Sequence, residues 1–150
     1  MINWENVEYF DPNVDKFPEG ELNLACPELI YQLNTFRKVL GRPIYPSPVK
    51  GALARQSGSE NSRHYAVNRL SDAIDVFCTG DPFHTWITAI TSKLWGGIGI
   101  YPFTRFQGRE WVMFHLDMRP GMTLWVRDRD GAYYYPQRIE HIKKFKELIC

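Results

Sequence analysis

The chain has 150 residues, of which 44% are hydrophobic and 15% aromatic, so it can bury a core and is neither disordered nor of low complexity. A net charge of +1 without any basic block argues against nucleic acid or an anionic membrane as a partner. The sequence lacks a membrane-spanning stretch and the features of a signal peptide. We therefore expect one domain over residues 1–150, made in the cytoplasm, with three reduced cysteines.

The first predicted element is a helix over residues 27–40, which follows an irregular lead-in over residues 1–25. Pro27 suits the first position of a helix, and apolar residues then recur at helical spacing. Three prolines predict an extended connection over residues 43–48. Residues 51–72 are polar and have no apolar period, which predicts a loop.

The second half of the chain mixes strands with two further helices. Asp81 followed by proline predicts a helix start, and the buried side of that helix is predicted to carry Phe83, Ile87, Ile90 and Leu94. Pro136 opens a last amphipathic helix, whose inward face is predicted to carry Ile139, Ile142, Phe145 and Ile149. Because the strands and helices lack a regular βαβ order, we expect an α+β fold in which a small, mainly antiparallel sheet packs against two to three helices. The predicted strands cover residues 73–78, 98–101, 111–118 and 123–127.

Polar side chains interrupt two of these apolar strands. Asp75 lies between Ile74 and Val76, and a carboxylate in such a place is costly unless it is paired or bound to a cation. His115 and Asp117 lie two residues apart and therefore on one strand face. Together with a loop histidine, His64, these residues offer the three ligands of a catalytic zinc site with its fourth position left for water. The alternative is that Asp75 pairs with an arginine and the histidines have no ligand role.

The order of these motifs resembles the zinc D-Ala-D-Ala metallopeptidases, the superfamily of lysostaphin-type and cell-wall carboxypeptidases, phage endolysin endopeptidases and the hedgehog domain. The resemblance covers roughly residues 27–120, particularly the small phage and bacterial branch. It implies a zinc ion held by His64, Asp75 and His115, and a substrate-facing arginine at Arg55. The matching segments are Ser62-x-His64, Ala73-x-Asp75, Gly97-Ile98-Gly99-Ile100-Tyr101-Pro102 and His115-x-Asp117.

The spacing of the first two ligands departs from this family. His64 and Asp75 are eleven positions apart, whereas about seven is usual, and the family glycine between them is absent. Asp72 is closer to the usual spacing. We favour Asp75 because it keeps Ala-x-Asp and lies within the apolar strand, which leaves Asp72 in a lengthened loop.

A peptidase of this kind also needs a general base. The family often places a glutamate three residues before its last ligand, but Val112 occupies that position here. Glu110 is the nearest carboxylate and is the base that we predict. Asp117 is the rival, and its alternative role is to orient a ligand histidine or to pair with Arg119.

Two functions follow from these motifs. The first is zinc-dependent hydrolysis of a peptide bond in peptidoglycan stem peptides or cross-links, by an endopeptidase or a D,D-/L,D-carboxypeptidase. The second is a non-catalytic zinc-binding structural or interaction module, such as a phage tail component. A phage-encoded protein would act at the cell wall, from the virion or the host periplasm, with virion or lysis proteins as possible partners.

Overall fold

The computed structural model describes all 150 residues, and its centre is a six-stranded sheet with the order β1-β2-β4-β3-β5-β6. All neighbouring strands are antiparallel except β3 and β5, which are parallel. The predicted α+β class with a mainly antiparallel sheet is thus confirmed. The strands are β1 (Ile44–Pro46), β2 (Ala73–Cys78), β3 (Gly97–Phe106), β4 (Arg109–Asp117), β5 (Thr123–Arg127) and β6 (Tyr133–Tyr134).

Three helices accompany the sheet: α1 (Pro27–Leu40), α2 (Pro82–Ser92) and α3 (Ile142–Ile149). The first helix ends where Gly41 takes a left-handed conformation with φ 66°, which glycine adopts without steric cost. At the start of α2 the side chain of Asp81 accepts backbone N–H groups and so caps the helix. None of the helices has the length and apolar character needed to cross a membrane.

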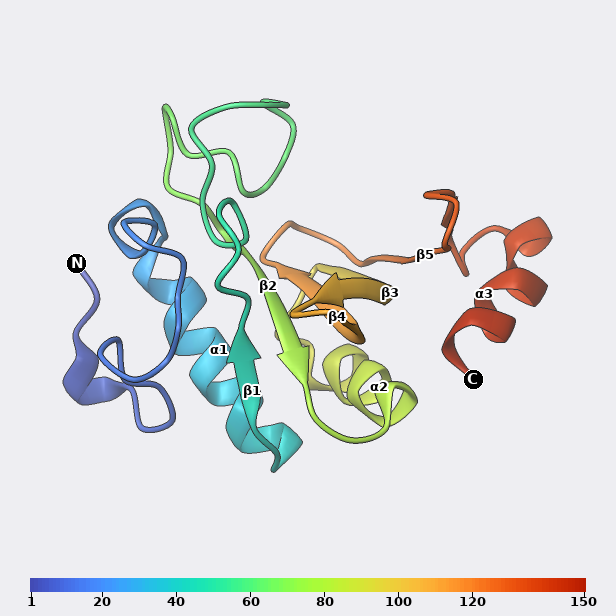
Figure 1. The fold of residues 1–150 in the computed structure, drawn as a ribbon, viewed down its shortest axis with the longest axis horizontal. Coiled ribbons are helices and arrows are strands. Elements are labelled where there is room, and N and C mark those ends of the chain that lie inside the picture. The colour runs from blue at the N-terminus through green and yellow to red at the C-terminus, as the bar shows by residue number, and fades with distance from the viewer.

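The helices and the sheet share one apolar core. In β2 and β4 every second residue points into this core, because side chains alternate between the two faces of a strand. The other sheet face carries the intervening, more polar residues. The N-terminal segment and α3 lie at opposite ends of the molecule, and the 51–72 loop extends beyond the end of β2 (Figure 1). The core includes Ile74, Val76, Phe114 and Leu116 from the strands and Leu29, Leu33 and Phe36 from α1.

Two predicted inward faces are only partly right: Ile90, Leu94, Phe145 and Ile149 pack in or against the core as predicted, but the remaining predicted residues do not. In α2 the buried residues are Thr85 and Ala89, whereas Phe83 and Ile87 are exposed. Apolar residues occur on most sides of this helix, so their spacing does not identify the side that faces the core. The small side chains of Thr85 and Ala89 let α2 approach its neighbours closely on the buried side. Ile139 and Ile142 are also exposed: residues 139–141 form a 3-10 turn before α3, and Ile142 is the first residue of that helix.

The lead-in is irregular, as predicted, but it is not loosely attached. It contains two short 3-10 turns and a buried carboxylate, that of Glu21. This carboxylate accepts the backbone N–H groups of Gly51, Leu53 and Ala54 at 2.6, 3.0 and 2.8 Å. The lead-in therefore fixes the start of the long loop.

Candidate metal centre

The candidate centre lies on the sheet face opposite the core, in one row of cross-strand neighbours. Asp75 of β2 is opposite His115 of β4, which is opposite Gly99 of β3, and Trp125 of β5 lies next to Gly99. A Cβ atom at Gly99 would collide with the indole of Trp125, so glycine is required there. The indole packs beside the His115 ring, with centroids 5.2 Å apart. The row thus holds His115 between a carboxylate and an aromatic wall.

His64 reaches this row from the 51–72 loop. The backbone N–H of Arg55 donates to the carbonyl of His64 at 2.6 Å, and the N–H of Ala66 donates to the carbonyl of Arg55 at 2.7 Å. These bonds fold the loop back on itself and place His64, only 2% exposed, over the strands. Its ring meets that of His115 edge-on, with centroids 4.8 Å apart.

The potential ligand atoms of His64, Asp75 and His115 form a small triangle. His64 Nε2 lies 3.0 Å from His115 Nδ1 and 3.3 Å from Asp75 Oδ1, and His115 Nδ1 lies 3.0 Å from Asp75 Oδ1. Ligand atoms bonded to zinc at about 2.0–2.1 Å occupy tetrahedron corners about 3.3 Å apart. The triangle therefore has nearly the dimensions of three corners of a zinc site, and the cluster could hold a metal ion.

Hydrogen bonds at the other ring nitrogens fix the tautomers of both histidines. His64 Nδ1 faces the carbonyl of Leu53 at 3.4 Å, and His115 Nε2 faces the carboxylate of Asp117 at 2.9 Å. Since a carbonyl and a carboxylate only accept, these two nitrogens carry the hydrogens. The lone pairs of the remaining nitrogens then point at each other across 3.0 Å. Such a contact needs a cation or a shared proton between the rings.

Asp117 lies behind His115 and is fully buried. Arg119 donates to this carboxylate from its guanidinium and its backbone N–H, so both carboxylate oxygens have partners. Gly97 of β3 leaves room for the carboxylate, because a Cβ atom there would collide with it. Asp117 thus contacts the imidazole of His115 on the side that faces away from the cluster. From there it can orient the ring, but it cannot act on a group bound at the cluster.

The pKa values of the cluster follow from these contacts. Burial by itself raises the pKa of Asp75, but hydrogen bonds with His115 and His64 outweigh it and hold that pKa well below its usual range. Burial lowers the pKa of His115, but Asp117 and Asp75 outweigh this effect and raise it. In the absence of a metal, the carboxylates therefore favour a proton on His115.

The structure leaves Asp72 out of the cluster. Its carboxylate pairs with Arg63, just before β2 begins. Asp75, the residue we favoured from strand context, is the one that joins the two histidines.

Glu110, the base predicted from the sequence, is not brought to the cluster. It lies five positions before His115 in β4, which is about 17 Å along the strand. Because five is an odd number, its side chain lies on the opposite face of the strand. Its exposed carboxylate binds Arg129 through both oxygens. No carboxylate other than that of Asp75 lines the cavity beside the cluster. Its Oδ2 atom has no hydrogen-bond partner and remains accessible.

That cavity, which we call the near cavity, has a volume of about 330 Å³. Asp75 forms part of its wall, and Arg55 and Lys50 line the side formed by the long loop. The structure therefore places Arg55, the predicted substrate-facing residue, in the same cavity as Asp75, a candidate metal ligand.

Two contributors had no signal in the sequence. The carbonyl of Leu53 orients His64, and Ser71 Oγ also donates to it, at 2.5 Å. Glu21 holds this segment through its three backbone hydrogen bonds. A backbone carbonyl leaves no mark in a sequence, and a glutamate in an irregular segment resembles any surface residue.

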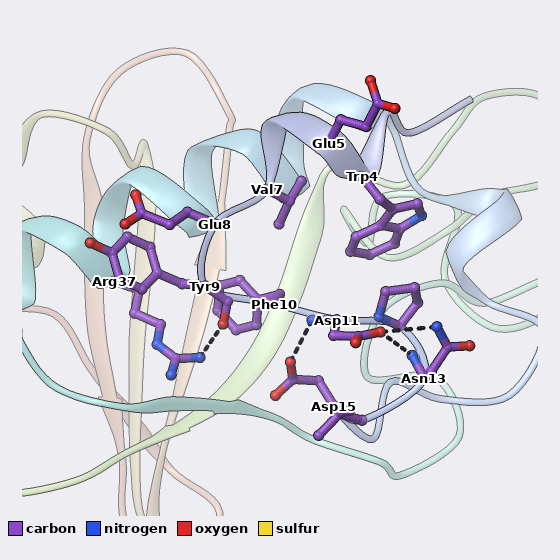
Figure 2. Close-up of a pocket in the computed structure, with 12 residues that line it drawn as sticks. Trp4, Glu5, Val7, Glu8, Tyr9, Phe10, Asp11, Asn13, Asp15 and Arg37 are labelled. Carbon is purple, nitrogen blue, oxygen red and sulfur yellow. Dashed lines mark hydrogen bonds between the residues drawn. The ribbon is translucent and has the colours of Figure 1, made fainter.

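A hollow of about 810 Å³, larger than the near cavity, lies elsewhere, in the N-terminal segment (Figure 2). Two of its carboxylates serve local turns: Asp11 accepts from Asn13, and Asp15 accepts the backbone N–H of Asp11 (Figure 2). Arg37 donates to the carbonyl of Tyr9. The arrangement explains the fold of this segment and adds no residue to the candidate centre.

Comparison of the chain with family models, with curated proteins and with solved structures finds no match. The assignment of a function therefore rests on the residues and on their geometry.

Proposed function

We propose that this protein binds a zinc ion through His64, Asp75 and His115 and hydrolyses a peptide bond in peptidoglycan stem peptides or cross-links. The observation that carries the proposal is the triangle of ligand atoms with edges of 3.0, 3.0 and 3.3 Å, in which two imidazole lone pairs and a carboxylate converge. The motif order shared with the zinc D-Ala-D-Ala metallopeptidases supports zinc and the wall substrate. If the protein is phage-encoded, it would act from the virion or in the host periplasm.

A zinc ion held there would lower the pKa of a coordinated water to about 7 and polarise the scissile carbonyl. The chain itself supplies the orientation: Asp117 and the Leu53 carbonyl keep one nitrogen of each imidazole free for the metal. The free Oδ2 of Asp75 is the carboxylate oxygen placed to accept a proton in the near cavity. Arg55 can bind a substrate carboxylate through its planar guanidinium.

The test combines metal analysis with digestion of purified peptidoglycan. We expect about one zinc per chain, loss of cleavage with a chelator and recovery when zinc is returned. Asp75→Ala should lose both zinc and cleavage, whereas Asp72→Ala, the matched control three residues away, should keep both. Cleavage that survives removal of the metal, or zinc retained without Asp75, would contradict the proposal.

A second candidate is the non-catalytic zinc-binding module. It is favoured by one observation, namely that neither Glu110 nor Asp117 faces the cluster as a general base. A protein with stoichiometric zinc that cleaves no stem peptide, with or without chelator, would establish this alternative.

A further inference from the structure

We propose that an aromatic cavity beside the candidate centre binds an N-acetylated amino sugar of the wall glycan, so that the preferred substrate is a stem peptide still attached to its sugar. The inference rests on the proposed function and extends it, because it adds the sugar to a site described so far only for the peptide. The position of the cavity, its aromatic lining and the polar groups at its edge carry the argument.

Three aromatic side chains lie on the sheet face of the candidate centre. Phe77 follows Asp75 by two residues in β2, and Tyr45 of β1 is the cross-strand neighbour of Phe77. Trp111 precedes His115 by four residues in β4. Residues at even spacing in a strand share one face, and so do directly opposite residues of neighbouring strands. The three side chains therefore extend the polar face of the sheet away from the metal cluster.

Phe106, the last residue of β3, joins these side chains from the β3–β4 hairpin. Its ring stacks on that of Phe77, with centroids 5.3 Å apart, and the ring of Phe77 meets that of Trp111 edge-on at 6.2 Å. Phe77 is buried but does not belong to the apolar core, while Trp111 and Tyr45 are 42% and 51% exposed. The four rings thus form an apolar surface outside the core, which is typical of a ligand-binding groove.

These rings line a cavity of about 370 Å³, which we call the aromatic cavity. Phe77 and Phe106 also line the near cavity, so the two cavities adjoin. The volume lies within the range of about 300–1,000 Å³ that is usual for small-molecule sites. A ligand in the aromatic cavity can therefore continue toward Asp75.

Polar side chains stand at the edge of the aromatic cavity. Lys16 makes no salt bridge, and Asp15 uses only Oδ2 in its own turn, which leaves Oδ1 free. Gln107, from the hairpin turn, can both donate and accept hydrogen bonds. A sugar ring has C–H groups on its faces and hydroxyl and acetamido groups at its edge. The aromatic rings and the polar edge fit both parts of a sugar, whereas an apolar peptide side chain would need the rings alone.

The spacing allows the sugar and its peptide to bind together. Phe77 lies about 7 Å from Asp75 along β2, and Trp111 lies about 13 Å from His115 along β4. An extended peptide covers such distances with about two to four residues. A sugar in the aromatic cavity can therefore remain joined, through its stem, to a peptide bond at the metal cluster.

The experiment compares three substrates of the zinc-loaded protein. The first is a disaccharide stem pentapeptide released from the wall glycan. In the second a lactyl cap, and in the third a phenylacetyl cap, replaces the disaccharide. Binding of the free disaccharide, which has no stem peptide to hydrolyse, is followed separately by nuclear magnetic resonance titration.

The variants remove aromatic rings inside and outside the aromatic cavity. Tyr45→Ala/Trp111→Ala removes its two exposed rings, and Tyr45→Ala alone tests the cavity with the smaller change, at an edge strand. The matched control is Phe83→Ala, which removes a ring of similar exposure, 40%, from α2, where it lines neither cavity.

We expect kcat/KM of the wild type to be at least about tenfold higher for the disaccharide peptide than for the lactyl peptide. The double variant should lose this preference and bind the free disaccharide at least about tenfold more weakly, with unchanged zinc content and unchanged kcat/KM for the lactyl peptide. Tyr45→Ala should lose part of the preference, and Phe83→Ala should keep all of it.

Three results would overturn the sugar site. The first is an equal preference in the double variant and in Phe83→Ala. The second is the absence of saturable disaccharide binding to the wild type. The third is a preference for the phenylacetyl peptide as large as that for the sugar, which would assign the aromatic cavity to an apolar side chain. Failure of the proposed function would appear separately, as disaccharide binding without chelator-sensitive cleavage of any of the three substrates.

Discussion

The two faces of the sheet are built from the same strands but are stabilised in different ways. Leu116 is fully buried in the apolar core, whereas His115, its neighbour in β4, lies on the other face among charged groups. Burial of the apolar face is favourable without any ligand. On the polar face, two imidazole lone pairs and a carboxylate meet, so that this face is balanced only by a metal ion or a proton. The comparison separates residues that maintain the fold from residues that prepare a site.

The largest effect should come from the apolar face. Leu116→Ala should lower the free energy of unfolding by about 2–5 kcal/mol, because it leaves a cavity in the core. Denaturant unfolding of the metal-free protein measures this change. His115→Ala should cost less stability in the same assay and should abolish zinc binding. If the histidine variant were the less stable one without metal, the two faces would not divide in this way.

The next effect concerns the carboxylate behind His115. Asp117→Asn should weaken zinc binding by about 10–100-fold, since the charge that orients the imidazole and raises its basicity is lost. Competition with a chromogenic chelator gives the affinity, and Asp72→Asn serves as the control. An unchanged affinity would show that Asp117 supports the fold and not the metal.

A smaller effect, the change of stability with pH, also distinguishes the two faces of the sheet. Because the pKa of His115 is raised in the folded protein, the metal-free protein gains stability from its protonation below about pH 6.5 and loses that gain as pH rises through the raised pKa. The pKa values of Asp75 and Asp117 are lowered, so their stabilisation is complete at neutral pH and is lost progressively as pH falls below about 4. Zinc competes with the imidazole proton, so zinc affinity should instead rise over the range in which the metal-free protein weakens. Thermal unfolding from pH 5 to 8, with and without zinc, tests this prediction. If the stability of the metal-free protein and the stabilisation by zinc changed with pH in the same direction, the prediction would be wrong.

The smallest effect is expected at Glu110. Its ion pair with Arg129 is exposed and contributes little to stability, so Glu110→Gln should change kcat by less than about twofold. Steady-state kinetics on a stem peptide measures it. A large loss of kcat with zinc retained would restore Glu110 as the base and require the hairpin to move.

The sequence predicted the parts of the site that follow from strand periodicity. Asp75 and His115 interrupt apolar strands, and alternation alone places them on one face. The sequence did not predict that Glu110 lacks access to the cluster. The reason is that the carboxylate is held by Arg129, which lies 19 residues further along the chain. The inward face of α2 was predicted only in part, because its fully buried residues, Thr85 and Ala89, are small and do not belong to the apolar period.

The hydrogen bonds of Glu21 bear on any attempt to move this domain into another protein. A fusion that began at Pro27 would keep every helix and strand of the sheet but would lose the carboxylate that anchors Gly51, Leu53 and Ala54. The segment that carries the Leu53 carbonyl to His64 would then be held by fewer bonds, chiefly the one from Ser71 Oγ, although the excised residues include no candidate ligand. The smallest transplantable unit therefore begins before Glu21, within a segment that has almost no regular structure.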